Sequence, residues 1–369
     1  MKQGWEYKKI GNICNITTGK LDANAANEDG LYPFFTCSRI PLSINTYAYD
    51  CECILIAGNG DLNVKYYNGK FNAYQRTYIL QLKNDVNGVE MRYIFAFFNL
   101  YIEELRRKSI GGIIKYIKLG DLTNALLPLP DITTQLSIVS ELDKINELIR
   151  LKQEQLKDYD NLAQSIFYEM FGDPVENEKG WEVKKIGEIG SVERGAGISK
   201  KDFVEDGLPC IHYGQLHTIL GARTKKHYTS IPHDLLPKYK VAHTGDLVMA
   251  ITSEDVEGSC KSTAWLGNYD VIVGSDAAIL HHEQDGTFLS YYTMTKAFYN
   301  EKAKYAKGFK VTHISTKEIE KISVFLPPLP LQHLFAQRIE QIERQKSAVQ
   351  KSITDLETIL ASRMQYWFE

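Results

Sequence analysis

The feature that most constrains this fold is an internal repeat. Residues 4–11 read GWEYKKIG and residues 180–187 read GWEVKKIG, so seven of eight letters agree 176 positions apart. A second matching pair, GGIIKYIKLGDLTNALLPLP at 111–130 and GFKVTHISTKEIEKISVFLP at 308–327, is separated by 197 positions. The chain is therefore predicted to hold two units, each with a shared opening, a variable interior and a shared closing. The second unit is 21 residues longer than the first.

Each unit is followed by a tail with a heptad pattern. Positions 138 to 170 of the first tail carry mostly apolar residues at spacings that alternate four and three, and positions 335 to 367 of the second tail repeat this register. The charged exceptions in these two series are Lys152, Lys346 and Arg363. The pattern predicts two helices of about 36 residues, roughly 54 Å long. Pro130 and Pro330 are expected just before the helices. The predicted seam consists of Leu142, Ile145, Ile149, Leu156, Ile339, Ile342, Val349, Ile353, Leu356 and Leu360.

The two helices are expected to pair with each other in antiparallel orientation. The first helix leaves unit one and arrives at unit two, so the second helix must run back along it. The predicted architecture is a pseudo-twofold dumbbell of two similar mixed α/β (α+β) domains joined by an antiparallel coiled coil. Roughly 54 Å along B-DNA corresponds to about 15 base pairs, which suggests two readers with an unread spacer between their sites.

The interiors are expected to mix short strands, turns and a few helices. Residues 51–60 and 245–254 resemble buried strands that run into turns. Residues 91–109 and 287–308 have helical periodicity and basic C-terminal ends. The domain boundaries follow as 1–130 for the first globular domain, 131–173 for the first helical spacer, 174–327 for the second globular domain and 328–369 for the second spacer.

Composition favours a soluble cytoplasmic protein. Apolar residues make up 44% of the chain and charged residues 24%, which is ordinary for a globular protein. The N-terminus lacks the pattern of a secretory signal, and the longest near-apolar run, at 93–102, is too short to span a bilayer. Six cysteines are scattered as in a reducing compartment. The C-x-C of Cys51 and Cys53 is more typical of buried or free thiols than of a zinc site.

Catalytic motifs are missing or weak. The stretches 57–63 and 194–201 each offer only two glycines, fewer than a methyltransferase cofactor loop requires, and no phosphate-binding loop of the G-x-x-x-x-G-K-[ST] type is present. The acid–lysine pairs of Glu6 with Lys8 and Glu182 with Lys184 could serve metal-assisted hydrolysis. The first pair has no acid upstream of it to complete a metal site, and strand alternation explains both pairs better.

The repeated openings, the Leu-Pro closings and the sequences TTQLSIVSELDKI and LPLQHLFAQRIEQI after them resemble the specificity subunit of type I restriction-modification systems. The resemblance covers essentially the whole chain. It implies that each interior is a target recognition domain, and that the helices space these domains and dock two modification subunits. It also implies a bipartite target on double-stranded DNA, N6-adenine methylation with S-adenosylmethionine in the modification subunits, and cleavage by restriction subunits where these are present. No catalytic residue, metal or cofactor is expected in this chain, and no membrane contact. The two interiors share little outside their edges, so they are expected to read unlike half-sites.

The charge distribution only partly supports DNA binding. The net charge is +3 for residues 1–130, −5 for 131–173, −1 for 174–327 and zero for 328–369, which gives −3 for the chain. Strong DNA-binding domains are usually far more basic. Base reading is therefore expected to depend on local clusters, with many phosphate contacts left to partner subunits.

Candidate DNA-binding residues are cations, amides and rings near turns, because Arg and Lys can read guanine edges and Gln can read adenine. In the first interior they are Lys20, Arg39, Lys65, Lys70, Gln75, Arg76 and Lys115. In the second interior they are Lys200, Lys201, His212, Tyr213, Gln215, Arg223, Lys225, Lys226, Lys307 and Lys310. Each of these could instead be an ordinary solvated surface residue.

Two functional hypotheses follow. The first is a non-catalytic DNA sequence-specificity subunit that scaffolds a methylating and restricting complex. The second is a free-standing DNA-binding or adaptor protein whose coiled coil mediates dimerisation. The two seams within one chain can satisfy each other, which favours the first hypothesis.

Overall fold

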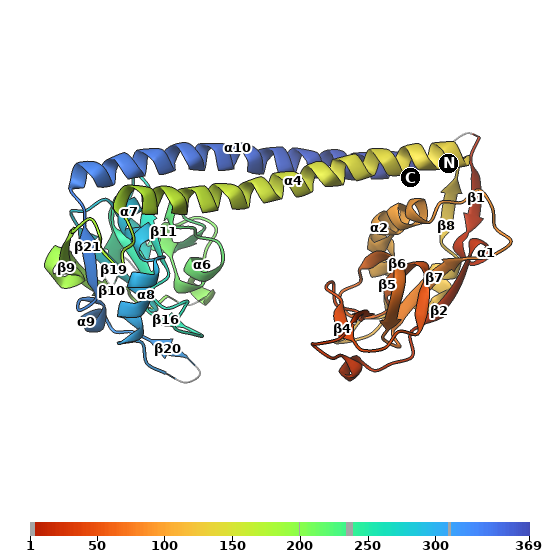
Figure 1. Ribbon diagram of the computed structural model, residues 1–369, viewed down its shortest axis with the longest axis horizontal. Helices are drawn as coiled ribbons and strands as arrows, with labels where there is room; N and C mark the ends of the chain where they lie inside the picture. The colour runs from red at the N-terminus through yellow and green to blue at the C-terminus, as the bar shows by residue number, and fades with distance from the viewer. Residues whose placement is uncertain (1–3, 199, 234–238, 309–310) are drawn as a thin grey trace. The chain divides into compact units, whose positions relative to one another are not determined.

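The computed structural model describes residues 4–198, 200–233, 239–308 and 311–369 (Figure 1). Within these ranges the chain forms two compact units. Unit 1 comprises Met1–Glu154 and Val349–Glu369, and unit 2 comprises Gln155–Ala348. Each unit therefore contains a part of both helical tails. In the ranges described, no helix is both long enough and apolar enough to cross a membrane.

Unit 1 is built on a six-stranded sheet with the order β2-β7-β5-β6-β3-β4. Its elements are β2 (Cys14–Thr18), η1 (Ala23–Ala25), β3 (Tyr32–Phe35), β4 (Leu42–Ile44), β5 (Tyr49–Ala57), β6 (Val64–Ala73), β7 (Thr77–Leu82) and α2 (Met91–Lys108). Neighbouring strands are antiparallel, except that β3 and β6 are parallel. Helix α2 packs against β5 and β6 (Figure 1).

The buried strand predicted at 51–60 is β5, and it separates two parts of the core. Ile54 and Ile56 pack with the residues of α2. Cys53 and Leu55 lie in a second cluster with Phe71. Successive side chains of a strand point to opposite faces, so an apolar run of this kind suits a sheet covered on both sides. Burial raises the pKa of the Cys53 thiol, and no cluster of three or more potential metal ligands occurs among the described residues.

The interior of unit 2 contains a five-stranded sheet, a four-stranded sheet and a strand pair. The five-stranded sheet has the order β10-β19-β15-β17-β12, formed by β10 (Gly190–Arg194), β12 (Arg223–Thr224), β15 (Leu247–Ala250), β17 (Ser262–Trp265) and β19 (Ala277–His282). The four-stranded sheet has the order β13-β11-β18-β14, formed by β11 (Leu208–Ile211), β13 (Thr229–Ile231), β14 (Lys240–Ala242) and β18 (Val271–Val273). The pair is β16 (Thr252–Ser253) with β20 (Thr312–His313), and the helices of this interior are η2 (Lys200–Asp202), α6 (Tyr213–Thr218), α7 (Gly286–Tyr292) and α8 (Lys296–Ala303).

The helical prediction for 287–308 was wrong in one respect, because this segment forms two helices, α7 and α8. Thr295 explains the break. Its hydroxyl donates to the carbonyl of Tyr292 over 2.8 Å and accepts from the N–H of Phe298 over 3.4 Å. A threonine that caps a helix N-terminus competes with continuation of the preceding helix.

The repeated phrases form a frame that closes each unit. The opening strand β1 (Glu6–Lys9) pairs antiparallel with the closing strand β8 (Leu126–Leu129). In unit 2, β9 (Glu182–Lys185) pairs in the same way with β21 (Ser323–Leu326). A short helix follows each opening strand, α1 (Ile10–Ile13) in unit 1 and α5 (Ile186–Ile189) in unit 2. Another short helix precedes each closing strand, α3 (Leu119–Thr123) in unit 1 and α9 (Thr316–Ile319) in unit 2.

Equivalent hydrogen bonds hold the two frames. The N–H of Ile10 donates to the carbonyl of Ala125, and the N–H of Ile186 donates to the carbonyl of Ile322, each over 2.9 Å. Both isoleucines are buried. The sequence repeat therefore encodes one closed frame twice.

Both tails are continuous helices of 40 residues, α4 (Ile132–Phe171) and α10 (Leu329–Phe368). They are about one turn longer than predicted. Pro330 does not precede α10 as expected, because it is the second residue of that helix. The first turn of a helix tolerates proline, since the backbone N–H groups there have no partner within the helix.

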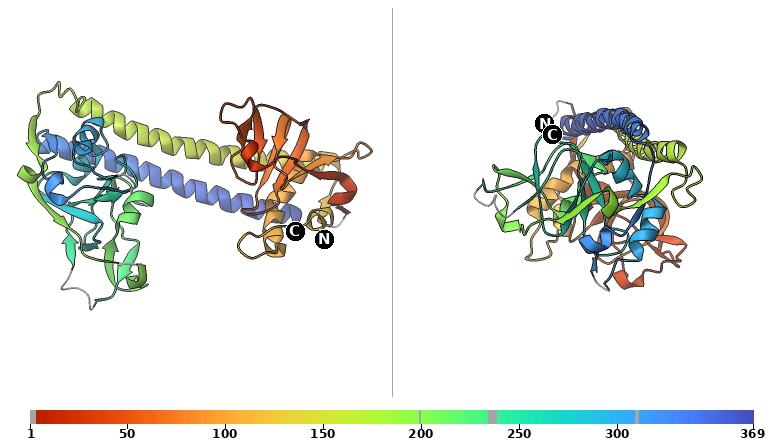
Figure 2. Two further views of the ribbon diagram at one scale, coloured as in Figure 1. Left: turned by 90° about the horizontal axis from the view of Figure 1, so that it is seen from below. Right: turned by 90° about the vertical axis from the view of Figure 1, so that its left-hand side faces the viewer.

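The helices pair in antiparallel orientation within each unit (Figures 1 and 2). In unit 1, Glu141 near the start of α4 accepts hydrogen bonds from Arg363 and, over 3.0 Å, from the indole N–H of Trp367 near the end of α10. In unit 2, Lys346 lies 2.7 Å from Asp160, and Arg338 lies 3.7 Å from Glu169.

All ten predicted seam residues are buried or half-buried. Those that are less than one-tenth exposed are Leu142, Ile149, Ile339, Ile342, Val349 and Ile353. The half-buried ones are Ile145, Leu156, Leu356 and Leu360.

Each unit's core also extends onto the helix pair. Leu142 and Phe368 join the core of unit 1, and Phe167, Phe171 and Phe335 join the core of unit 2. The fold class predicted from the sequence, two mixed α/β domains with two long paired helices, is confirmed.

A buried glutamine joins each helix to its unit at equivalent positions of the repeat. Gln332 is fully buried, donates to the carbonyl of Pro327 over 2.8 Å and to Gln284, and accepts from the N–H of Asp285 over 3.0 Å. Gln135 is also fully buried and makes the matching bonds to Pro130 and Glu90 in unit 1. The two side chains fix the direction in which each helix leaves its unit.

Replacing Gln332 with alanine should destabilise unit 2. The substitution leaves buried backbone groups without partners, at a cost of about 1–3 kcal/mol for each group. We expect urea unfolding, followed by circular dichroism, to give a lower midpoint for Gln332→Ala. Gln337→Ala, at an exposed position of the same helix, is the control. Equal midpoints for the two variants would contradict a role for this side chain in holding the helix.

Candidate nucleic-acid interface

Five loops of unit 1 converge, and they carry most of the candidate residues of that unit. They are 19–22, 36–39, 58–63, 74–76 and 110–118, and we call them the loop cluster of unit 1. Backbone hydrogen bonds connect them: the N–H of Gln75 donates to Leu21, the N–H of Gly58 donates to Arg76, and the N–H of Gly60 donates to Lys115. The side chains of Lys20, Gln75, Arg76 and Lys115 are exposed there.

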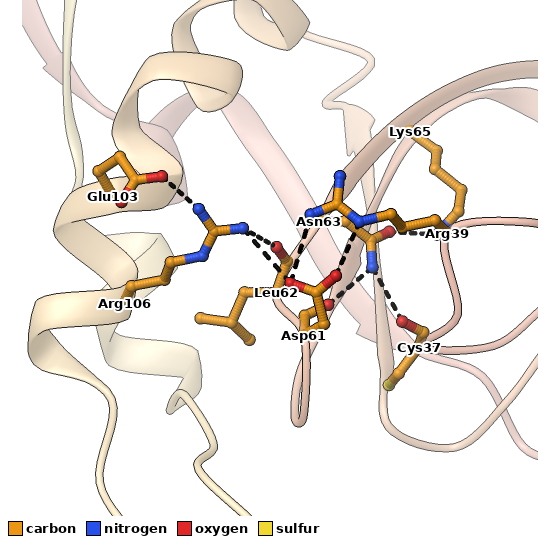
Figure 3. Close-up of polar contacts among 8 residues, drawn as sticks. All are labelled: Cys37, Arg39, Asp61, Leu62, Asn63, Lys65, Glu103 and Arg106. Atoms are coloured by element: carbon orange, nitrogen blue, oxygen red, sulfur yellow. Dashed lines mark hydrogen bonds and ion pairs between the residues drawn. The ribbon is translucent and has the colours of Figure 1, made fainter. Parts of the chain in front are cut away.

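An ion-pair network holds the exposed Arg39 in place (Figure 3). Its Nε lies 2.7 Å from a carboxylate oxygen of Asp61, and Arg106 on α2 approaches the same carboxylate at 3.5 Å. The hydrogen bond from Arg39 holds the pKa of Asp61 below its usual range. One carboxylate therefore holds two guanidinium groups, each of a kind that can grip a phosphate or a guanine edge.

Lys65 on β6 lies beside this network and donates to the side-chain oxygen of Asn63 (Figure 3). Asn63 is itself fixed, because its amide donates to the carbonyls of Cys37 and Asp61, each over 2.8 Å. Burial lowers the pKa of Lys65. An ammonium group held at the edge of the solvent in this way would gain from a nearby anion.

A shallow cavity of about 340 Å³ opens beside Gln75 and Arg76. Its lining includes Thr18, Tyr116 and Lys118, so it combines cations with hydrogen-bonding groups and a ring. The Gln75 amide donates to Asp22 over 2.5 Å. The amide is therefore oriented at the cavity by a neighbouring carboxylate.

Lys70 has no recorded contact with the loop cluster. It lies on β6, where its ammonium group is 4.7 Å from the centre of the Tyr47 ring. Asp50 is its partner in the strand register. Lys70 therefore fits a solvated surface residue better than a member of the cluster.

In unit 2, Arg223 serves the fold. Its side chain is only 10% exposed and forms an ion pair with Glu340 of α10, which Lys225 also approaches at 3.0 Å. One nitrogen of Arg223, Nη1, is buried and has no hydrogen-bond partner among the described residues. Burial alone would raise the pKa of Glu340, but Lys225 and Arg223 together hold it below its usual range. This ion pair joins the interior of unit 2 to helix α10.

Gln215 is also an internal residue. It is 3% exposed; its amide donates to Thr229 over 3.1 Å and accepts from the backbone N–H of His212 over 3.2 Å. The His212 ring stacks on Phe203 at 5.0 Å, while Tyr213 is 43% exposed. Of these candidates, Tyr213 is the most accessible.

The remaining cations of unit 2 are dispersed. Lys201 and Lys226 are exposed, and Lys307 lies 3.3 Å from Glu318. Lys200 belongs to η2, although its side chain is outside the description, and Lys310 lies outside the described residues. Unlike unit 1, unit 2 does not bring its candidates into one connected group among the described residues.

A larger cavity of about 1140 Å³ lies within unit 2, and Tyr213 is part of its lining. Lys261 and Lys302 also line it, but their ammonium groups donate to the carbonyls of His217 and Glu257. Three carboxylates, those of Glu254, Asp255 and Glu257, lie around the same cavity. Its charge does not favour a phosphate.

Sequence patterns missed several members of the loop cluster of unit 1. Arg106 sits in a helix that reads as a core element, and Lys118 was not distinguished from other loop lysines. The acids Asp22 and Asp61 carry no local signal either. Their positions next to Gln75 and Arg39 depend on contacts between residues 22 to 53 positions apart.

The known proteins that resemble this chain belong to type I restriction-modification systems. The profile of a family described as "Type I restriction modification DNA specificity domain" matches residues 2–158 and 178–358. The type I restriction enzyme EcoDI specificity subunit of Escherichia coli is 26% identical, over 95% of this chain and 84% of that protein. The type I restriction enzyme MjaVIII specificity subunit of Methanocaldococcus jannaschii is 23% identical, over 92% and 86%.

Two solved structures have the same fold. The S subunit of a type I restriction-modification system from M. genitalium superposes with a TM-score of 0.57 at 14% identity, covering 100% of this chain and 98% of that one. A chain from a study of complex assembly and conformational transition of the type I R-M system gives a TM-score of 0.58 at 18% identity, with the same coverage.

Replacing Arg223 with alanine should lower the stability of unit 2, because the carboxylate of Glu340 loses its most buried partner. Breaking a pair of this kind costs about 3–5 kcal/mol when it is fully buried, so a smaller loss is expected here. The depressed pKa of Glu340 means that its contribution is present above its ordinary pKa of 4.5 and is lost as the pH falls through its lower value in the folded protein.

We therefore expect the difference in unfolding free energy between the parent and Arg223→Ala to be largest near neutral pH and to shrink in acid. Urea titrations at several pH values would measure it. Lys226→Ala, at an exposed position nearby, is the control. A difference that does not change with pH would contradict the pairing with Glu340.

Proposed function

Because the chain belongs to the type I restriction-modification DNA specificity family, we propose that its two units each read one half of a bipartite DNA target. The resemblance inferred from the sequence is confirmed by the family match and by the relatives. The chain is a specificity subunit, which directs a reaction and does not catalyse it. The adaptor hypothesis, which was the alternative and assumed a free-standing protein, is not favoured by the family match.

The observation that carries the proposal is the pairing of a repeated frame with unlike interiors. Strands β1 and β8 close one interior, and β9 and β21 close the other with equivalent bonds. The sheets inside differ in strand number and order. A frame that stays constant while its contents vary is suited to presenting two different reading surfaces. We propose residues 1–130 and 174–327 as target recognition domains, and residues 131–173 and 328–369 as the helical spacers.

We propose that unit 1 contacts DNA through Lys20, Arg39, Lys65, Gln75, Arg76 and Lys115, with Arg106 and Lys118 in addition. For unit 2 we propose Lys201, His212, Tyr213, Lys225, Lys226 and Lys307. The buried Arg223 and Gln215 and the separate Lys70 are left out of this proposal. Phosphate contacts would position each unit, and base contacts would specify the sequence.

The helices are the proposed docking site for two modification subunits, which would supply S-adenosylmethionine and methylate adenine at N6. Restriction subunits would join the same assembly. Four leucines on α4 are between 46% and 50% exposed and would contribute apolar area to such a docking site; they are Leu136, Leu148, Leu151 and Leu162. The acidic character of residues 131–173 would favour protein over DNA along this helix.

The direct test is to express the chain with the methyltransferase encoded beside it and to map N6-methyladenine across a host genome. The proposal predicts methylation at one bipartite motif with an unread gap of fixed length. An active methyltransferase that leaves no motif in the presence of this chain would contradict the proposal and would return attention to the adaptor hypothesis.

Charge-removing substitutions in the loop cluster should weaken DNA binding in a salt-dependent way. We expect Arg76→Ala and Lys115→Ala, each assembled with the methyltransferase, to lower the slope of log K against log salt concentration by about 0.9 for each lost phosphate contact. Lys70→Ala is the matched control and should keep the parental slope. Fluorescence anisotropy on a duplex carrying the mapped motif would measure all three. Parental slopes for both Arg76→Ala and Lys115→Ala would remove the loop cluster from the interface.

A further inference from the structure

Each unit carries a narrow hairpin at the start of its closing segment. In unit 1, Ile110 and Tyr116 exchange two backbone hydrogen bonds, of 3.0 and 2.9 Å. In unit 2, Lys307 and His313 exchange two bonds, of 3.0 and 2.8 Å, at positions exactly one repeat offset away. Gly111 and Gly308 follow the first residue of each hairpin. Their φ angles are +120° and +135°, which residues other than glycine rarely adopt.

The tip of the unit 1 hairpin exposes large apolar side chains. Ile113 is fully solvent-exposed, at 105% of its reference area, and Ile114 is 62% exposed. In unit 2, Val311 stands at the position equivalent to Ile114 and is 45% exposed. Single exposed apolar residues are ordinary, but two adjacent β-branched side chains at the tip of a built turn leave apolar area uncovered.

The hairpin of unit 1 is fixed at its base. The N–H of Gly60 donates to the carbonyl of Lys115 over 2.9 Å, and Ile117 donates to Gly58 over 3.0 Å. The side chain of Ile117 is buried. A Cβ on Gly111 would come within 2.6 Å of the carbonyl oxygen of Ile114, so the turn is closely packed. The exposed tip thus projects from a rigid base, and no described residue covers it.

The surroundings of the tip favour a polyanion. Lys115 follows the two isoleucines directly and is exposed, and the hairpin belongs to the same loop cluster as Arg76 and Arg39. Tyr116 and Lys118 line the cavity beside Gln75. A partner that meets this surface must therefore offer negative charge around an apolar interior. Duplex DNA does so, since phosphates flank stacked bases.

We propose that the hairpin tip of unit 1, Ile113 and Ile114, is a wedge that inserts from the minor groove between two base pairs of the target, while Lys115 holds the adjacent phosphate. This inference rests on the proposed function and adds a mode of reading to it. Aliphatic side chains that enter base steps from the minor groove unstack them and bend the duplex. The proposal is confined to unit 1, because the residue at the position equivalent to Ile113 in unit 2 is Lys310.

The wedge would contribute to specificity without hydrogen bonds to bases. Pyrimidine–purine steps such as TA and CA unstack at the lowest cost, so a wedge favours targets that place such a step at its position. This reading requires no net positive charge, which agrees with a chain whose formal net charge is −3.

The test uses the complete complex with its methyltransferase and two duplexes that carry the mapped motif. One duplex is fully paired, and the other has a mismatch at the step facing unit 1, where unstacking is already partly complete. We expect the double variant Ile113→Ala/Ile114→Ala to bind the paired duplex at least about tenfold more weakly than the parent, because it loses the apolar contact between bases. On the mismatched duplex the parent should gain affinity and the variant should gain less. 2-Aminopurine placed at the step should brighten with the parent only.

Leu126→Ala is the matched control, since Leu126 is a 55% exposed aliphatic residue on β8, outside the loop cluster. It should bind both duplexes as the parent does. Equal binding of the paired duplex by the double variant and the parent, or no 2-aminopurine response in the parent, would overturn the wedge. A double variant that no longer assembles with the methyltransferase would also overturn it, in favour of a protein-docking tip. A parent complex without any motif would instead refute the proposed function itself.

Discussion

The short antiparallel strand pair that closes each unit is the constraint on which the rest of the structure depends. Strand β1 meets β8 more than a hundred residues later, and β9 meets β21 in the same way. Closing such a long loop costs entropy that grows only slowly with its length. A frame of this kind can therefore tolerate interiors of different length and topology, as the longer second unit illustrates. The closing strand also leads directly into a long helix, so the frame determines where that helix begins.

The paired helices obtain their register from polar contacts as well as from the apolar seam. Lys346 occupies a seam position in unit 2, where it is held by Asp160 and by Glu343, each within 3.2 Å. Burial alone would lower the pKa of Lys346, but these two carboxylates keep it above its usual value. A polar residue at a seam position disfavours shifted registers, because a shift would leave its charge unpaired. In unit 1, Arg363 also occupies a seam position, and it forms an ion pair with Glu141 of the other helix. The seam supplies affinity between the helices, and these pairs supply alignment.

The sequence could predict whatever depends on local pattern or on repetition. The heptad spacing was enough to place the seam of α4 and α10, and the apolar run of β5 was enough to predict a buried strand. The break between α7 and α8 was missed because Thr295 acts through its cap and not through its place in the periodicity. Arg223 was predicted to be a DNA-binding residue, yet its partner Glu340 is 117 residues away. Gln215 and Lys70 were likewise predicted to contact DNA, but the first is buried and the second lies apart from the loop cluster. Whether a polar side chain faces solvent or a distant element is decided by tertiary contacts, and no pattern within a few residues encodes them.

The proposed contact through the loop cluster of unit 1 would reconcile the small net charge of the chain with a polyanionic partner. Arg39 and Arg106 share Asp61, and Gln75 is held by Asp22, so these three side chains have acidic partners in the free protein. These pairs are largely solvent-exposed, and exposed ion pairs contribute little to stability. A phosphate that takes the place of the carboxylate beside the same guanidinium group would therefore cost the protein little stability. The side chains meanwhile keep most of their orientation before binding, which reduces the entropy lost when DNA arrives. In the proposed interface, Asp22 and Asp61 would reduce non-specific attraction to DNA and keep the reading side chains oriented. Discrimination between sequences would then depend on whether the base edges make hydrogen bonds that replace those made by the two acids.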